Sequence, residues 1–225
     1  MKFPIFLIAL LLPAGAMAQD HGHKDSADHD HAKPAVAAKR VVPATAVSPE
    51  YIQLATNVEV IPDIEKAVSS PSAVLTHEGL FGPLLFAENN RAFFIELKPG
   101  MFLGEHPHDT GSIVYTVRGR WVLASEGKRQ VMEAGSLFRF GDKMPTGWEA
   151  PFPEGALLLI VKGKAPNDGY ETFSRGIKSM QAMVDKERKE GEAFYFNALK
   201  PDHPAVVFAR SVNPNFDELV KNIKY

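Results

Sequence analysis

The sequence predicts an all-β core, an antiparallel sandwich or barrel, followed by a helical extension. Short apolar runs of strand length recur from Gly82 to Val161, and turn residues separate them at intervals of roughly 8–12 residues. Closer to the C-terminus, apolar residues recur at helical spacing instead. A length of 225 residues with 45% hydrophobic residues suits one globular domain with extensions.

The composition excludes several classes of function. The 25 Lys and Arg nearly balance the 27 Asp and Glu, which argues against a nucleic-acid-binding protein. The absence of Cys excludes disulfides, thiolate metal sites and thiol nucleophiles, so any metal must be held by nitrogen and oxygen. The sequence also contains no P-loop, no dinucleotide-binding glycine fingerprint and no G-x-S-x-G motif.

Residues 1–18 have the pattern of a secretory signal peptide. Lys2 is followed by the apolar run Ile5–Leu12, and small residues precede a cut after Ala18, with a cut after Ala16 as the alternative. The apolar run is too short to span a bilayer, so we expect no stable membrane anchor. The mature protein is therefore expected in the periplasm or outside the cell.

Residues 19–40 are predicted to form a disordered, histidine-rich tail, because they include almost no large apolar residue. The tail contains two H-x-H pairs among several aspartates: His21, His23, His29 and His31. Neutral imidazole suits Cu, Ni and Zn, so these four histidines are candidate metal ligands. The alternative is a solvated linker without a metal.

Residues 41–81 are expected to form an N-terminal extension. Ser48-Pro49-Glu50 predicts the start of a helix, because Pro is favoured at the first helical position. Val58–Ile61 has the β-branched pattern of a strand.

Residues 82–163 contain the predicted barrel strands. Their expected ranges are Pro83–Ala87, Arg91–Leu97, Met101–Leu103, Ser112–Val117, Arg120–Ala124, Arg129–Met132, Ser136–Phe140 and Ala156–Val161. Arg118-Gly119 is the turn expected between the fourth and fifth of these strands.

This stretch resembles the cupin family of small jelly-roll barrels. The first cupin motif is Gly, five residues, His-x-His, three or four residues, Glu, six residues and Gly; here Gly100, His106-Pro107-His108 and Gly119 match it. Ser112 stands where the family has Glu. The resemblance implies a jelly-roll barrel with the His pair inside it.

The second cupin motif is mostly replaced. Gly135 matches its first position, but Gly141, Lys143, Thr146 and Ala150 occupy the positions of the family's Pro, Gly, His and Asn. In the family, three His and one Glu bind Mn, Fe, Ni, Cu or Zn. The resemblance therefore implies a divalent-metal site that this chain has in degenerate form.

His106 and His108 are the main candidate ligands, since residues two apart on a strand share one face. Asp109 and His77 are candidates for a third ligand, and Glu105 and Glu96 are further possible substitutes. Three interpretations stay open: a pair without metal, a reduced metal site, or metal-free acid–base and hydrogen-bonding groups. The candidate pocket residues around the pair are Ser112, Tyr115, Thr146 and Trp148.

Residues 164–225 are expected to form a helical extension. Thr172 is the candidate cap of a helix that ends before Gly191, and its apolar stripe is Phe173, Ile177, Met180 and Val184. A final helix is expected after Asn213-Pro214. Ala193–Leu199 and Ala205–Ala209 are expected as strands or covering segments. We expect the helices to pack on the barrel or on a second subunit, as in a homodimer.

The leading hypothesis is an exported cupin-domain protein that binds a small molecule or a divalent metal in the barrel through His106 and His108. The first alternative, implied by the family alone, is a metal-dependent enzyme of the lyase, isomerase or oxygenase type. The second is a periplasmic protein that handles Cu, Ni or Zn through its tail.

Overall fold

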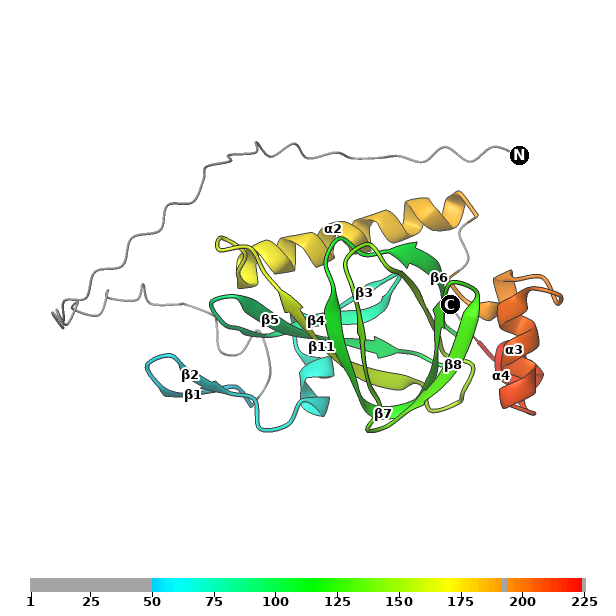
Figure 1. Ribbon diagram of the computed structural model, residues 1–225, viewed down its shortest axis with the longest axis horizontal. Helices are drawn as coiled ribbons and strands as arrows, with labels where there is room; N and C mark the ends of the chain where they lie inside the picture. The colour runs from blue at the N-terminus through cyan, green and yellow to red at the C-terminus, as the bar shows by residue number, and fades with distance from the viewer. Residues whose placement is uncertain (1–49, 192–193, 224–225) are drawn as a thin grey trace, which may run out of the picture. The chain divides into compact units, whose positions relative to one another are not determined.

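A curled antiparallel sheet of nine strands dominates the computed structural model, which describes residues 50–191 and 194–223 (Figure 1). The strands are β3 (Val74–Thr76), β4 (Gly79–Phe86), β5 (Asn90–Leu97), β6 (Phe102–Pro107), β7 (Ser112–Ser125), β8 (Lys128–Glu133), β9 (Leu137–Phe140), β10 (Pro145–Glu149) and β11 (Ala156–Gly163). Their order is β3-β4-β5-β11-β7-β10-β6, with β8 and β9 also paired to β7. The predicted all-β core is confirmed.

Strand β7 passes straight through the turn expected at Arg118-Gly119, so that prediction was wrong. Gly119 adopts a φ of 78°, a left-handed conformation that bends the chain without ending the strand. The first part of β7 pairs with β9 and β11, and the part after Gly119 pairs with β8 and β10. One bent strand therefore joins the two halves of the sheet.

The inner face of the sheet carries the largest apolar core. Phe93 and Ile95 of β5 alternate with side chains on the outer face, and they meet Val114 of β7 and Ile160 of β11 in one cluster. Trp121 is fully buried in the same cluster.

The outer face of β4, β5 and β11 is covered by the segment before β3. This segment includes the 3-10 helix η1 (Glu65–Ser69), whose Ala67 packs against Phe94 and Leu157. Both faces of these central strands are therefore buried, which explains their nearly continuous apolar sequences.

A two-stranded hairpin, β1 (Ile52–Ala55) and β2 (Val58–Val60), stands where a helix was expected after Pro49. The helix prediction was wrong because Asn57 takes a positive φ of 60°, which turns the chain back into an antiparallel pair. The strand expected at Val58–Ile61 is confirmed by β2.

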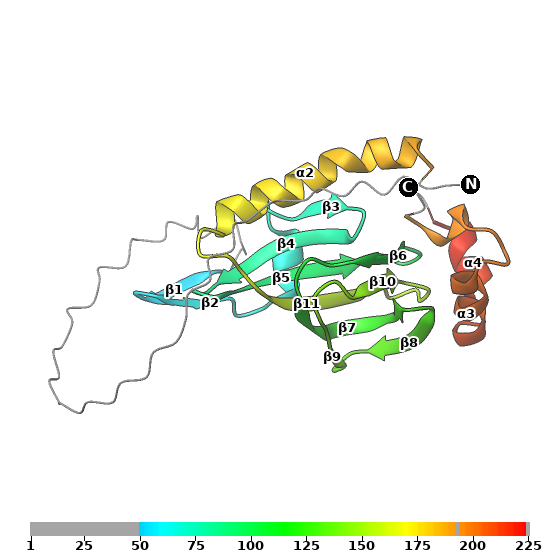
Figure 2. The same cartoon turned by 45° about the horizontal axis from the view of Figure 1, so that its top comes forward.

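Helix α2 (Tyr170–Lys189) lies along β3 and β4, as Figures 1 and 2 show. Its Phe173 packs against Phe81, Phe86 and Phe93, with ring centroids 5.4–5.7 Å apart. Thr172 lies within the helix rather than at its cap, because the helix begins at Tyr170. The predicted apolar stripe thus faces the inner side of the sheet.

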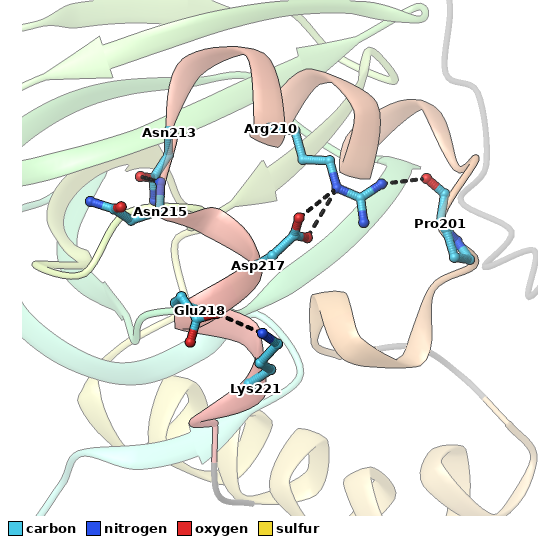
Figure 3. A network of polar contacts seen from close by, with 7 residues as sticks. All are labelled: Pro201, Arg210, Asn213, Asn215, Asp217, Glu218 and Lys221. Atoms are coloured by element: carbon cyan, nitrogen blue, oxygen red, sulfur yellow. Dashed lines mark hydrogen bonds and ion pairs between the residues drawn. The ribbon is translucent and has the colours of Figure 1, made fainter.

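The last described elements are η2 (Phe196–Ala198), α3 (Pro204–Val212) and α4 (Phe216–Lys221). The segment expected as a strand or cover at 205–209 is helical, since Pro204 occupies a first-turn position and His203 Nδ1 accepts a hydrogen bond from the Ala205 N–H. Arg210 of α3 forms an ion pair with Asp217 of α4 at 3.0 Å, and Figure 3 shows the two side chains facing each other. Their apolar faces pack against Phe102 of β6.

None of the described helices is both long and apolar enough to cross a membrane. The predicted signal peptide and the four tail histidines lie outside the described residues. The described residues all belong to one compact unit.

Candidate functional site

The histidine pair lies at the end of β6, where the two rings are in contact. The ring centroids of His106 and His108 are 4.5 Å apart. His106 Nδ1 lies 3.1 Å from the Gly104 carbonyl oxygen, and His108 Nε2 is hydrogen-bonded to Thr146 Oγ1 at 2.7 Å. Thr146 stands opposite His106 on β10, so pairing of the two strands brings these groups together.

Burial makes His108 a neutral imidazole near pH 7. Loss of hydration lowers the pKa of His108 to about 4, and the charges of His106 and Lys162 act in the same direction. The Phe140 ring, with its centroid 4.6 Å away, forms part of the surrounding wall. His108 can therefore donate or accept a hydrogen bond without carrying charge.

The candidates for a third metal ligand do not join the pair. Asp109 is 93% exposed and forms an ion pair with Lys143 at 2.6 Å. His77 lies between β3 and β4 and faces Glu187 of α2 at 3.4 Å. Within residues 50–191 and 194–223, no three His, Asp or Glu side chains are grouped so that they would hold a metal ion. These residues do not fit a three-ligand centre.

The predicted pocket residues separate into three positions. Ser112 and Trp148 line a cavity, whereas Thr146 is buried in contact with His108. Tyr115 is on the outer face and 40% exposed, so its prediction as a pocket residue is corrected. Strand alternation explains this: its neighbour Val114 has the inward position.

The cavity lies between the inner face of the sheet and α2 and has a volume of about 450 Å³. His108 lines it together with aromatic and aliphatic side chains, including Phe81, Phe93, Ile160 and Phe173. Gly176 of α2 is both a lining residue and exposed to solvent, which places it at an opening. A volume of this size suits a small organic molecule.

Charged residues outside the predicted site also line the cavity. Arg91 and Lys162 face each other on β5 and β11, and Asp168 forms an ion pair with Arg91. Glu78 completes the charged set. Strand alternation could have identified Arg91, because it lies two residues before Phe93 and four before Ile95 and so shares their inward face.

Two buried donors in this lining have no acceptor in the described part of the structure. They are Nε1 of Trp148, a residue only 2% exposed, and Nε of Arg91. A buried donor without a partner costs free energy, so the cavity is arranged to receive acceptor atoms.

A sequence profile described as "AraC-like ligand binding domain" matches residues 97–167. No curated protein matches the chain. An RmlC-like cupin from Shewanella frigidimarina is 22% identical over 43% of this chain and 85% of its own, with a TM-score of 0.38. A Cupin 2 conserved barrel domain protein from Salinispora arenicola is 20% identical over 59% of this chain and 98% of its own, with a TM-score of 0.40.

The polyketide cyclase RemF from Streptomyces resistomycificus is 14% identical over 50% of this chain and 87% of its own, with a TM-score of 0.37. At these identities the likenesses concern the fold and say nothing of activity. The cupin-related profile coincides with most of the curled antiparallel sheet, and the resemblance noted in the sequence is thereby confirmed. The fold is therefore cupin-like, and residues 97–167 match the AraC-like ligand binding domain family.

Proposed function

We propose that this protein binds a small organic molecule in the cavity between the inner face of its sheet and α2. The observation that carries the proposal is the cavity of about 450 Å³, which combines an apolar wall with buried donors that lack acceptors. Natural ligand pockets have this composition, with apolar walls that supply binding energy and a few polar groups that orient the ligand.

His108 contributes to binding as a neutral group. Its pKa of about 4 leaves it uncharged at neutral pH, and its contact with Thr146 holds the ring in place. We propose binding in preference to metal-dependent catalysis, because the described residues do not group three metal ligands.

A substitution at the opening tests the cavity directly. Gly176 has no atom within 4 Å of the position that a Cβ would take, so a side chain fits there without a local clash. We expect Gly176→Trp to block the opening, whereas Gly176→Ala leaves it free and serves as the matched control. Both variants replace Gly within a helix, which by itself favours the helix.

The probe is N-phenyl-1-naphthylamine, an uncharged apolar dye whose fluorescence rises in a dry pocket. We expect saturable binding of one dye per chain to the unmodified protein and to Gly176→Ala, and a loss of at least about tenfold in affinity for Gly176→Trp. Equal binding by both variants, with both folded by circular dichroism, would contradict binding in this cavity.

We also propose export of the protein and metal capture by the tail, on the strength of the signal-peptide pattern and the two H-x-H pairs. Mass spectrometry of the mature N-terminus checks the cut after Ala18. Metal analysis with and without residues 19–40 then locates any bound Cu, Ni or Zn. Metal that is retained without the tail and is lost on His106→Ala plus His108→Ala would restore the barrel metal site as the function.

A further inference from the structure

We infer that the ligand of this cavity is an organic carboxylate with an apolar body, whose negative charge is recognised by Lys162 and Arg91. The inference rests on the proposed function and specifies the class of molecule that the cavity takes. It is carried by the unpaired ammonium group of Lys162 and by the hydrogen-bond donors in the lining that have no acceptor.

Lys162 brings a positive charge into the cavity that no neighbouring carboxylate neutralises by direct pairing. It is half-buried, and among the described residues no Asp or Glu lies within ion-pair distance of its ammonium group. Burial lowers the pKa of Lys162 and the charge of Arg91 lowers it further, while the more distant carboxylates of Glu78, Asp109 and Asp142 raise it.

Two positive side chains stand directly opposite each other at this end of the sheet. Lys162 of β11 pairs in register with Arg91 of β5, an arrangement that is destabilising for like charges on one face. Asp168 pairs with Arg91 through one terminal nitrogen, whereas Lys162 has no carboxylate within ion-pair distance among the described residues. A ligand carboxylate placed there would give Lys162 an ion-pair partner.

Glu78 also lines the cavity, but its partner in the described structure is His77, 4.0 Å away. Its charge raises the pKa of Lys162 and so helps to keep the ammonium group protonated. Glu78 therefore favours the charged form of Lys162 without forming an ion pair with it.

The neutral polar groups point to the same kind of ligand. The orphaned atoms of the lining, Trp148 Nε1 and Arg91 Nε, are both N–H donors. The hydroxyl of buried Ser112, which stands opposite Lys162 in the sheet, adds a third donor. Such donors need acceptor oxygens, which a carboxylate provides in a compact, charged form.

The aromatic and aliphatic walls of the cavity indicate that the rest of the ligand is apolar. The Arg91 guanidinium lies over the Phe173 ring at 5.2 Å, and further along the cavity the lining is aromatic and aliphatic. An apolar body in contact with these walls gains binding energy from the area that it removes from water.

The test compares two molecules of nearly equal shape, 1-naphthaleneacetate and 1-naphthaleneacetamide, as competitors of N-phenyl-1-naphthylamine. At about pH 7.5 we expect the acid to displace the dye at a concentration at least about tenfold lower than the amide. In Lys162→Met we expect this preference to fall to about twofold or less, while the dye itself still binds.

Controls separate the carboxylate inference from the cavity proposal. Lys128→Met removes an exposed lysine of β8 and should keep the full preference for the acid. Trp148→Phe keeps an aromatic wall but lacks the Nε1 donor, so we expect a several-fold larger loss of affinity for the acid than for the dye.

Equal displacement by acid and amide, or an unchanged preference in Lys162→Met, would overturn the carboxylate inference and leave binding in the cavity intact. Dye binding that survives in Gly176→Trp would instead overturn the cavity proposal, and the inference with it. Lys162→Met is expected to fold, because it relieves the repulsion with Arg91.

Discussion

At the scale of the residue, one hydrogen bond between Thr116 and Trp121 stabilises the barrel interior. Both are fully buried, and Trp121 Nε1 donates a hydrogen bond to Thr116 Oγ1 at 2.9 Å. The bond joins two positions on either side of the bend in β7, so it satisfies the indole donor at a place that water does not reach.

Thr116→Val keeps the size of the side chain but leaves the Trp121 N–H without an acceptor. We expect a loss of about 1–3 kcal/mol in the free energy of unfolding, measured in urea. The matched control is Thr110→Val at an exposed position, which should change stability by less than about 0.5 kcal/mol. A loss of equal size in both variants would contradict a role for the hydrogen bond.

The histidine pair illustrates the limit of prediction at the scale of the residue. The spacing of His106 and His108 predicted two rings on one side, and the structure brings them together. The remaining candidate ligands have other partners: Asp109 forms an ion pair with Lys143, and His77 lies against Glu187 of α2. Such partners come from elements far away in sequence, which local spacing does not specify.

At the scale of the element, the bend in β7 depends on the backbone of Gly119. A Cβ at this position would lie 2.0 Å from the Gly155 carbonyl oxygen and 2.9 Å from the Ala156 Cα. Both atoms belong to the backbone at the start of β11, so neither can rotate away. The close approach lets β7 stay paired with β11 up to the bend.

Gly119→Ala should therefore cost more than the left-handed conformation alone. Gly127 has a similar φ of 74° with no atom within 4 Å of its Cβ position, so Gly127→Ala measures the conformational cost, about 1–2 kcal/mol. We expect a clearly larger loss of unfolding free energy for Gly119→Ala, because the Cβ displaces backbone atoms. Equal losses would show that the close approach is easily relieved.

Helix α2 is the element that converts an open sheet face into a cavity. Its stripe was predictable from the spacing of Phe173, Ile177 and Met180. The face of the sheet that it covers was not, because the choice depends on how β3 and β4 extend beyond the predicted strands.

At the scale of the whole molecule, two buried groups shape the dependence of stability on pH. The folded pKa of His108, about 4, lies below its ordinary value of 6.5. Its contribution to stability is therefore complete above about pH 6.5 and is lost as the pH falls toward 4. In His108→Asn we expect this loss to vanish, so the stability difference between the two proteins should change between pH 7 and pH 4. Urea unfolding at several pH values in this window is the measurement.

Glu149 changes the stability with pH in the direction opposite to that of His108. Burial raises the pKa of Glu149 from 4.5 to about 7, although Arg129 Nε donates to its two oxygens at 3.0 and 3.2 Å and opposes the shift. Its contribution to stability is complete below about pH 4.5 and is lost as the pH rises through 7.

Glu149→Gln replaces the carboxyl by a group that stays neutral. We expect its unfolding free energy, relative to that of the unmodified protein, to rise from pH 5 to pH 8. A constant difference over this range would show that the carboxylate is already charged at pH 5 in the folded protein. The His108 variant is the comparison, since its difference should change with the opposite sign.

The sequence by itself determined the all-β class, most strand positions, the α2 stripe and the cupin motif with its two histidines. These follow from local rules, because side-chain alternation and helical spacing are properties of neighbouring residues. Only the tertiary structure decided that β7 bends instead of turning at Gly119, and that Tyr115 lies outside the pocket.

Only the tertiary structure, too, placed Lys162 beside Arg91 and covered them with α2 to form the cavity. The physical reason is that charge compensation and burial depend on which distant segments meet. Strand alternation predicts which face of the sheet each residue occupies. The packing of β5, β11 and α2 decides which side chains that residue contacts.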